Sequence, residues 1–214
     1  MQTRTALISV YNKDGIAPFV QSLVDLGFEI LSSGGTAKVL QEAGITVTDV
    51  ASLVGEPILG HRVVTLSREI HAGLLARDNE EDRAELKKLN TPFIDLVCCD
   101  LYPLKEEISK TGATLDSVIE KTDIGGPTML RSAAKGGRIV IADVNDRQKV
   151  IDYLKQGNHD EGFVRRLAAK AEFIIAEYCM HSANYLSGKY YTAVLCDHYP
   201  NDHHTTPSRT IVIN

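Results

Sequence analysis

One segment of the chain gathers groups that can transfer protons and hold a negatively charged ligand. It reads Thr122-Asp123-Ile124-Gly125-Gly126-Pro127-Thr128-Met129-Leu130-Arg131-Ser132-Ala133-Ala134-Lys135. Two glycines let the backbone approach a ligand closely, and Pro127 suits the first position of a helix. The free N–H groups at a helix start favour negative charge. Asp123 precedes this helix start, and Lys135 lies a little over two helical turns after Pro127. The segment therefore predicts either an acid, an amine and an oxyanion cradle for a polar substrate, or a tight turn into a buried helix that a carboxylate caps.

A second segment has the composition of a phosphate-binding turn. Ser32-Ser33-Gly34-Gly35-Thr36 follows an apolar run at 28–31 and precedes helix-forming residues at 37–43. A strand, a Ser/Gly-rich turn and a helix start together cradle phosphate with backbone amides and hydroxyls. The P-loop spacing and the dinucleotide-binding spacing are both absent. Many such turns bind nothing, so this signal needs support from the rest of the chain.

Alternating strand and helix patterns must position these two segments. Apolar runs and side-chain spacing predict strands at 5–10, 28–31, 45–50, 94–99 and 138–142. Helices are predicted at 16–26, 37–43, 79–90, 114–121 and 145–155, the last with Asp143 or Asn145 as its cap. A mostly parallel sheet flanked by helices follows, a Rossmann-like α/β fold. In such folds ligands bind at the carboxyl ends of the strands, which here carry Ser9, Asn12 and Lys13, the Ser-Gly-Gly-Thr turn, and Leu101-Tyr102-Pro103.

The last third of the chain differs from the α/β core. We expect one domain over 1–214, in which a core at 1–156 is followed by a long helix at 160–187 and two strands, at 191–196 and 209–213. The loop between those strands contains His198, His203 and His204. Their spacing matches no strong metal template, so a solvated loop is the default over a metal site.

Composition limits the classes of function. With 43% hydrophobic residues, 24% charged residues and a net charge of −5, the 214-residue chain offers no broad basic surface for nucleic acid. A signal peptide and a membrane-spanning run are both missing from the sequence. The cysteines form no C-x-x-C pair, and Cys98 and Cys99 lie in an apolar run. We therefore expect free buried thiols and a cytoplasmic location.

Several ordered motifs make the chain resemble a known family, the IMP cyclohydrolase domain of the bifunctional enzyme that completes purine biosynthesis. The resemblance covers roughly residues 4–190, and it rests on motifs at 8–15, 31–38, 62–66, 70–75, 100–103 and 123–135. It implies a methylglyoxal-synthase-like fold and a homodimer. It also implies ring closure of a formamido carboxamide ribonucleotide (formyl-AICAR) to IMP and water, with no cofactor and no metal. Because the chain ends at Asn214, we expect the companion formyltransferase half to be absent and a separate formyltransferase to be a partner.

The resemblance also implies roles for individual residues. Asp123 would handle a proton, and Lys135 and Tyr102 would donate to developing charge. Arg62 and Thr65 would fix the base or its oxygens. The 5′-phosphate would be held by Lys13, Ser33, Gly34, Gly35 and Thr36. The other expected substrate-binding residues are Ser9, Asp100, Ile124, Gly125 and Gly126.

The chain departs from the family pattern in the segment expected to be catalytic. Val64 replaces a family lysine, Ser67-Arg68 replaces His-Pro, and Asp100 replaces an asparagine. Arg68 follows Val64 by one helical turn and could place a cation in the vacated space, although it could not act as a base. Two functions therefore compete: a diverged cyclohydrolase, and a purine-nucleotide or phosphometabolite-binding module that lacks this chemistry. Phosphate elimination of the methylglyoxal-synthase type ranks third.

Overall fold

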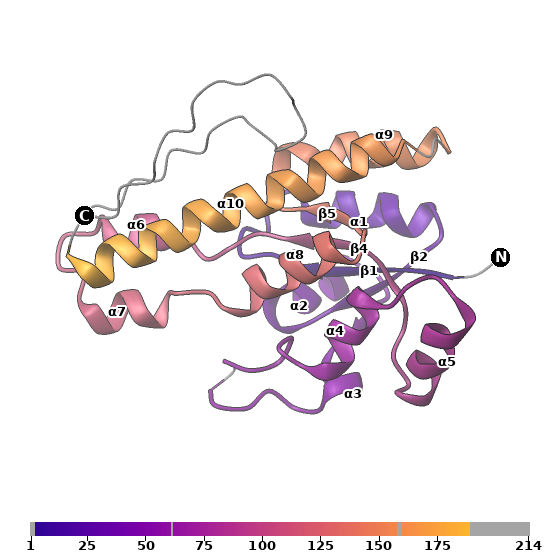
Figure 1. The fold of residues 1–214 in the computed structure, drawn as a ribbon, viewed down its shortest axis with the longest axis horizontal. Helices are drawn as coiled ribbons and strands as arrows, with labels where there is room; N and C mark the ends of the chain where they lie inside the picture. Colours follow the sequence, from indigo (N-terminus) through magenta and orange to yellow (C-terminus); the bar gives the residue numbers. More distant parts are fainter. Residues whose placement is uncertain (1–2, 61, 158–159, 189–214) are drawn as a thin grey trace, which may run out of the picture. The chain divides into compact units, whose positions relative to one another are not determined.

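The fold is built on a parallel sheet. The structure, a computed structural model, describes residues 3–60, 62–157 and 160–188. Its five strands are all parallel and lie in the order β3-β2-β1-β4-β5. Figure 1 labels β1, β2, β4 and β5 among the surrounding helices. The strands are β1 (Arg4–Ser9), β2 (Phe28–Ser32), β3 (Thr48–Asp49), β4 (Ile94–Cys99) and β5 (Ile139–Ile141). The predicted α/β fold with a mostly parallel sheet is confirmed.

Helices connect the strands, as a parallel sheet requires. They are α1 (Ile16–Asp25), α2 (Gly34–Glu42), α3 (Ala51–Val54), α4 (Arg68–Leu75), α5 (Glu80–Lys88), α6 (Leu104–Ile108), α7 (Leu115–Glu120), α8 (Gly125–Lys135), η1 (Val144–Asp146), α9 (Arg147–Lys155) and α10 (Glu161–Ser187).

The central strand β1 is buried on both faces of the sheet. Ala6 and Ile8 point into one apolar cluster with residues of α1 and α9, and Leu7 points into the other with residues of α4 and α8. This division follows from the alternation of side chains along a strand. A strand covered on both faces reads as a continuous apolar run, which is why β1 and β4 could be recognised from the sequence.

The chain divides into two compact units. One comprises residues 1–102 and 123–175 and contains the whole sheet. The other comprises 103–122 and 176–214; within it the Tyr178 hydroxyl donates a hydrogen bond to the Lys121 carbonyl at 3.2 Å. The expected single domain, with a boundary near residue 156, stays a prediction.

Several elements differ from the sequence prediction. The third strand is shorter, because Ile45 donates its N–H to the Leu40 carbonyl at the end of α2 and only Thr48 and Asp49 pair with β2. Helices α3, α4 and α6 were not predicted. The strands expected at 191–196 and 209–213, and the histidine-rich loop between them, lie outside the described residues.

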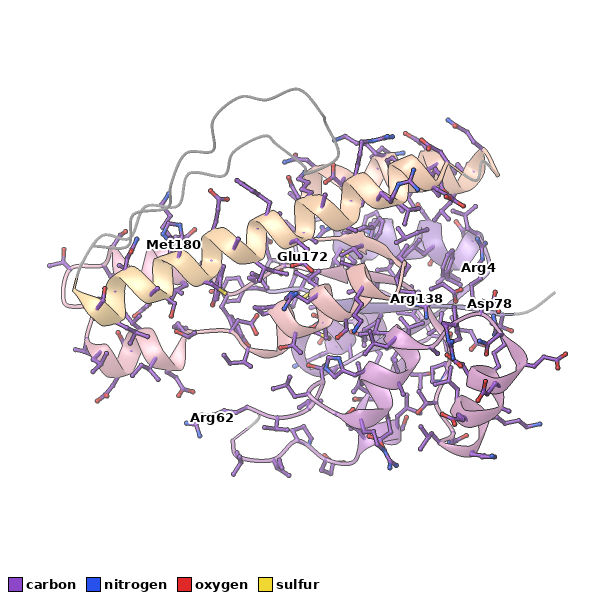
Figure 2. All side chains as sticks on the ribbon, viewed as in Figure 1. Arg4, Arg62, Asp78, Arg138, Glu172 and Met180 are labelled. Atoms are coloured by element: carbon purple, nitrogen blue, oxygen red, sulfur yellow. The ribbon has the colours of Figure 1, made fainter. Side chains whose placement is uncertain are left out.

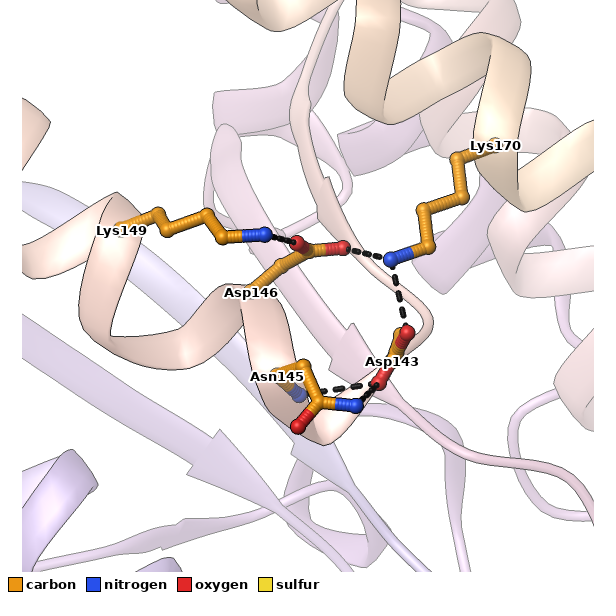
Figure 3. A network of polar contacts seen from close by, with 5 residues as sticks. All are labelled: Asp143, Asn145, Asp146, Lys149 and Lys170. Atoms are coloured by element: carbon orange, nitrogen blue, oxygen red, sulfur yellow. Dashed lines mark hydrogen bonds and ion pairs between the residues drawn. The ribbon is translucent and has the colours of Figure 1, made fainter.

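A polar network ties α10 to the carboxyl end of β5 (Figure 3). The Asp143 side chain accepts the N–H of Asn145 at 2.9 Å and so caps η1, while its other oxygen lies 2.7 Å from the Lys170 amine. Lys170 also donates to the buried carboxylate of Asp146 at 2.5 Å, and Lys149 donates to the same carboxylate at 2.8 Å. Asp143 thus caps η1, the turn that leads into α9, whereas α9 itself begins at Arg147 after Asp146 and without a side-chain cap.

Two further sequence expectations concern burial and hydrophobicity. Cys98 and Cys99 are free and buried, as expected, and burial raises the pKa of Cys98 to about 11. Within the described residues, none of the helices combines the length and apolar character that crossing a membrane requires.

Candidate functional site

The topology indicates where a ligand binds. The chain runs from β1 outward to β2 on one side and returns to β4 on the other, so the direction of winding reverses between β1 and β4. Parallel sheets bind ligands in the crevice outside the carboxyl ends of the strands at such a reversal. The loops after β1 and β4 begin there, at Val10 and Asp100.

The Ser-Gly-Gly-Thr turn lies at this same edge, and Thr36 anchors it. The Thr36 hydroxyl donates to the Val10 carbonyl at 3.1 Å and accepts the Val10 N–H at 3.2 Å. Because Thr36 is buried and both of these contacts are internal, its side chain fixes α2 against the end of β1. The same turn places Ser33 in extended conformation before α2, and Gly34 has a φ of +54° that suits glycine.

Lys13 extends from the loop after β1 over the α2 start. Its amine donates to the Tyr11 carbonyl at 3.1 Å and also to the Val10 carbonyl. Its Cε would lie 3.9 Å from a Cβ placed on Gly35. Burial lowers the pKa of Lys13, and the charge of Asp100 opposes that shift. The structure therefore places Lys13 beside Gly35, one of the glycines expected to hold a phosphate. Ser9 is half-buried at the last position of β1.

Asp100 makes its contacts with the protein itself. Its carboxylate accepts the backbone N–H of Tyr11, and its second oxygen accepts the N–H of Asn12 at 3.2 Å. The residue thereby links the loops that follow β4 and β1 across the point where the winding reverses. Its expected substrate contact stays a prediction.

Asp123 caps the helix that the glycine-rich segment begins. Its carboxylate accepts the N–H of Gly126 at 2.9 Å, and the N–H groups of Gly125 and Tyr102 also bond to it. Burial raises the pKa of Asp123, and the negative charge of Asp100 raises it further, while the three backbone hydrogen bonds oppose the shift. The two alternatives predicted for this segment, a helix-capping carboxylate and an acid that transfers protons, are therefore compatible. Asp123 caps α8, and its raised pKa at the ligand-binding edge of the sheet is also typical of a catalytic carboxylate.

Close contacts explain both glycines of this segment. A Cβ on Gly126 would lie 2.5 Å from Asp123 Oδ2 and 2.8 Å from Leu101 Cδ2. A Cβ on Gly125 would lie 3.0 Å from the Thr65 hydroxyl oxygen. Helix α8 begins at Gly125 rather than at Pro127, because the Asp123 carboxylate already satisfies the first N–H groups. Thr65 therefore lies beside the start of α8, and Ile124 is exposed just before it.

Tyr102 completes the group at this edge. Its ring packs edge-on against Tyr11, with ring centroids 5.4 Å apart. Burial raises the pKa of the Tyr102 hydroxyl, and the charge of Asp123 adds to the shift. The neutral phenol is therefore the form near neutral pH, a donor suited to developing negative charge.

Other expected residues lie elsewhere in the structure. Lys135 is the exposed last residue of α8, about 15 Å along the helix from Gly125. Arg62 is exposed, donates to the Leu59 carbonyl at 3.2 Å and points away from the sheet (Figure 2). Arg68 is exposed at the start of α4 and pairs with Glu69 at 3.3 Å, while Val64 packs against the apolar cluster of α4 and α8. Arg68 thus forms a surface ion pair with its neighbour Glu69, and its expected role as a replacement cation stays a prediction.

His71 and Ser67 make contacts that the sequence did not predict. His71 Nδ1 lies 2.8 Å from the hydroxyl of Ser132 on α8, and its Nε2 is buried without a hydrogen-bond partner. Burial lowers the pKa of His71, so the ring is neutral near pH 7. The Ser67 hydroxyl accepts the N–H of Ile70 at 3.2 Å, which caps α4. The pairing of His71 with Ser132 joins two helices and could not be read from local sequence.

Metal binding finds no support in the part of the chain that the structure describes. Among those residues, histidine, cysteine, aspartate and glutamate nowhere gather in groups of three or more that could hold an ion.

Comparison with known proteins identifies the class. The family model of the MGS-like domain matches residues 15–128, and the chain belongs to this family. Its relatives include the bifunctional purine biosynthesis protein PurH of Lysinibacillus sphaericus, 47% identical over 190 residues, and that of Bacillus cytotoxicus, 44% identical over 189 residues. Each alignment covers 86% of this chain but 37% of the relative, so the chain spans well under half of their length.

A solved structure agrees with this assignment. The crystal structure of ForH is 35% identical with a TM-score of 0.75, and the match covers 86% of this chain and 97% of that one. The family resemblance drawn from the ordered motifs is confirmed.

Proposed function

We propose that this protein is an IMP cyclohydrolase that closes formyl-AICAR to IMP and water in purine biosynthesis. The carboxamide nitrogen of the substrate attacks the formyl carbon, a tetrahedral hydroxyl adduct forms, and water leaves. This reaction needs an anchor for the 5′-phosphate, donors for the developing oxyanion, and a group that moves a proton. The names of the PurH relatives support the pathway.

The residues at the sheet edge fit these three tasks. The start of α2 and the Lys13 amine would hold the phosphate. The Tyr102 hydroxyl and the Thr65 hydroxyl would donate to the oxygen that develops negative charge. Asp123 would accept the proton of the attacking nitrogen and pass it to the oxyanion, which gives the hydroxyl adduct. In the second half of the reaction it would take the proton that the formamido nitrogen releases and deliver it to the departing hydroxyl, which leaves as water.

The position of Asp123 is the observation that carries the proposal. This carboxylate is held by backbone N–H groups from two segments, the start of α8 and the loop after β4, and its pKa is raised above the usual value. A fixed carboxylate with a raised pKa, at the edge where parallel sheets bind ligands, suits general acid–base catalysis.

The test follows IMP formation by absorbance with purified protein and formyl-AICAR. The proposal predicts turnover by the native chain and its loss in Asp123→Asn, whereas Asp25→Asn at the end of α1 serves as a matched control that keeps the activity. Lys135→Ala shows whether the lysine at the far end of α8 contributes. Absence of turnover by well-folded native protein would overturn the proposal.

A second function, binding of a purine nucleotide without catalysis, is favoured by one observation. Val64 lies in the apolar cluster where the family resemblance places a lysine, and Arg68 pairs with Glu69 instead. Loss of one preorganised donor or general acid costs on the order of 10²–10⁴ in rate. If the native chain binds IMP without turnover and Val64→Lys gains turnover, the binding function is correct.

The assembly and location are also proposals. We infer a cytoplasmic homodimer that receives its substrate from a separate formyltransferase, as the family resemblance implies. Light scattering coupled to size-exclusion chromatography tests the dimer, and a monomer at micromolar concentration would contradict it.

A further inference from the structure

A cleft of about 600 Å³ lies toward the amino ends of β1 and β2. Its floor is a patch of the sheet, where Thr5 of β1 is paired in register with Glu29 of β2. Leu31, two positions after Glu29, is paired in register with Thr48 of β3. Thr5 precedes Ser9 by four residues, which is about 13 Å along an extended strand. The cleft is therefore separate from the carboxyl edge of the sheet, where the candidate functional site lies.

Two helices form the walls of this cleft. Helix α3 contributes Leu53, and helix α5 contributes Leu86 and Lys87. Figure 1 shows both helices below the strands in its view. The leucines of the walls and the floor give the cleft an apolar interior, while Lys87 and Glu29 bring one charge of each sign to its lining.

Three polar side chains of the lining have no partner within the part of the chain that the structure describes. Thr5 is 5% exposed and its N–H donates to Asp95 at 2.8 Å, but its hydroxyl makes no hydrogen bond there. Glu29 and Lys87 form no ion pair with each other or with any other described residue. Because buried hydroxyl groups are as a rule hydrogen-bonded, the Thr5 hydroxyl indicates a position that a ligand group can fill.

The remaining charged and aromatic side chains of the lining are engaged already. Arg83 pairs with Asp78 at 2.6 Å, and its guanidinium lies 4.5 Å from the centroid of the Phe93 ring. The guanidinium of Arg138 lies 3.8 Å from the same centroid. A flat base therefore finds the Phe93 ring occupied by two cations.

The charges left over argue against a strongly anionic ligand as well. Lys87 is the one cation of the described lining that lacks a partner, and Glu29 repels additional negative charge. A ligand that carries both an ammonium group and a carboxylate would satisfy the two residues at once. Since each residue attracts one sign and repels the other, the pair also discriminates against ligands with a single charge.

We propose that this cleft binds a small zwitterion with an apolar body, of the chemical class of an apolar amino acid or a short apolar peptide. Glu29 receives the ammonium group, Lys87 receives the carboxylate, and the Thr5 hydroxyl bonds to a polar group between them. Leu53 and Leu86 contact the apolar part. The inference concerns the opposite end of the sheet and does not rest on the proposed function.

L-leucine and the dipeptide leucyl-leucine test the proposal. Each is compared with its N-acetyl form and its amide, which lack one of the two charges. Dissociation constants come from NMR titration of the backbone amides of the native protein. We expect the zwitterion to shift the amide signals of Thr5 and Glu29 and to bind at least about threefold more tightly than its singly charged forms, because each of these loses one ion pair. Binding of leucine assigns the cleft to free amino acids, and binding of the dipeptide alone assigns it to short peptides.

Variants locate the binding. Glu29→Gln and Lys87→Gln should each weaken binding of the zwitterion by about three- to tenfold, and Thr5→Val, which keeps the shape of the side chain, should weaken it by a similar factor. The matched controls are Glu85→Gln and Lys88→Gln, two exposed positions of α5 outside the lining, which should bind like the native protein. Thermal unfolding of each variant shows that the fold is retained.

Three results would overturn the inference. The first is the absence of binding of both leucine and the dipeptide to the native protein. The second is equal affinity for the zwitterion and its singly charged forms. The third is native affinity in both Glu29→Gln and Lys87→Gln, which would place the binding elsewhere.

Discussion

The carboxylate of Asp123 accepts a hydrogen bond from the backbone N–H of Gly126 at 2.9 Å, and a single added methyl group would break this arrangement. A Cβ at 126 would meet Asp123 Oδ2 at 2.5 Å, so Gly126→Ala must push the carboxylate out of its place. We expect turnover to fall by about 100-fold or more, because a small misplacement of a catalytic group costs on that order. Initial rates of IMP formation measure the change.

Gly125→Ala is the comparison for that substitution. Its Cβ would lie 3.0 Å from the Thr65 hydroxyl oxygen and would leave the Asp123 carboxylate in place, so it disturbs a proposed donor and not the proposed base. The expected loss is therefore smaller than that of Gly126→Ala. Equal losses in both variants would show that the helix start, rather than the Asp123 carboxylate, limits the rate.

The pH dependence of turnover reports on Asp123 directly. If its ionised form accepts the proton, the rate rises with pH through a pKa above the ordinary value of 3.8. Asp100→Asn removes a like charge that raises this pKa, so the rise should move to lower pH. Asp123→Asn should lower kcat by about 10²–10⁴-fold at all pH values. A rise that stays in place in Asp100→Asn would contradict the coupling between these carboxylates.

The Thr36 hydroxyl should contribute to stability rather than to binding. Thr36→Val leaves the N–H of Val10 without its buried partner, although the Val10 carbonyl keeps its bond from Lys13, and this costs about 1–3 kcal/mol in the free energy of unfolding. Thr36→Ser keeps the hydroxyl and should cost less. Urea unfolding followed by circular dichroism measures both variants. A Val variant as stable as the native protein would mean that the hydroxyl serves the ligand instead.

The Lys170 network predicts how stability depends on pH. Hydrogen bonds from Lys170 lower the pKa of Asp143; burial alone would raise that of Asp146, but its bonds to Lys149 and Lys170 outweigh burial and lower it. A lowered carboxyl pKa contributes stability above the unfolded value of 3.8, and this contribution is lost as the pH falls through the folded value. The raised pKa of Lys170 adds stability below 10.5 that is lost as the pH rises through its folded value.

Lys170→Met should remove most of this dependence. The variant leaves one oxygen of the buried Asp146 without a partner, which costs about 1–3 kcal/mol at pH 7. Lys149→Met is the comparison variant: it also removes one partner of Asp146, but it leaves both Lys170 contacts and the ion pair of Asp143 in place, so its effect should be smaller. Unfolding free energies between pH 3 and 7 compare the two, and equal curves would contradict the central position of Lys170.

The sequence predicted most of the sheet because its signal is local. Strand β4 has the bounds expected from its run at 94–99, since a strand buried on both faces is apolar at nearly every position, here all but Asp95. Helix α4 was missed because its eight residues include only a short apolar pattern behind the Ser67 cap. Helix α8 begins at Gly125, two residues before the expected start at Pro127, because the Asp123 side chain caps it.

The candidate site was predictable only where its parts lie in one segment. Asp123 with its glycines, and the Ser-Gly-Gly-Thr turn, were visible as motifs at strand ends. The contact of Asp100 with the Tyr11 N–H joins residues 89 positions apart, so no local pattern reveals it. The separation of Lys135 from the start of α8 depends on where the helix begins and ends, which the motif alone does not define. Because α8 runs from Gly125 to Lys135, the two ends of the motif lie at opposite ends of the helix.

The central place of β1 has a consequence for how the chain folds. Its partner β2 follows soon after it in the sequence, whereas its other partner β4 follows much later. The Thr5 N–H, for example, donates to the Asp95 carboxylate, which lies 90 positions along the chain. Closing so long a loop must precede the gain from pairing, which makes such sheets slow to form. During synthesis on the ribosome, one edge of the apolar strand β1 therefore stays unpaired until residue 99 has emerged, and this interval is when the nascent protein most needs protection from aggregation.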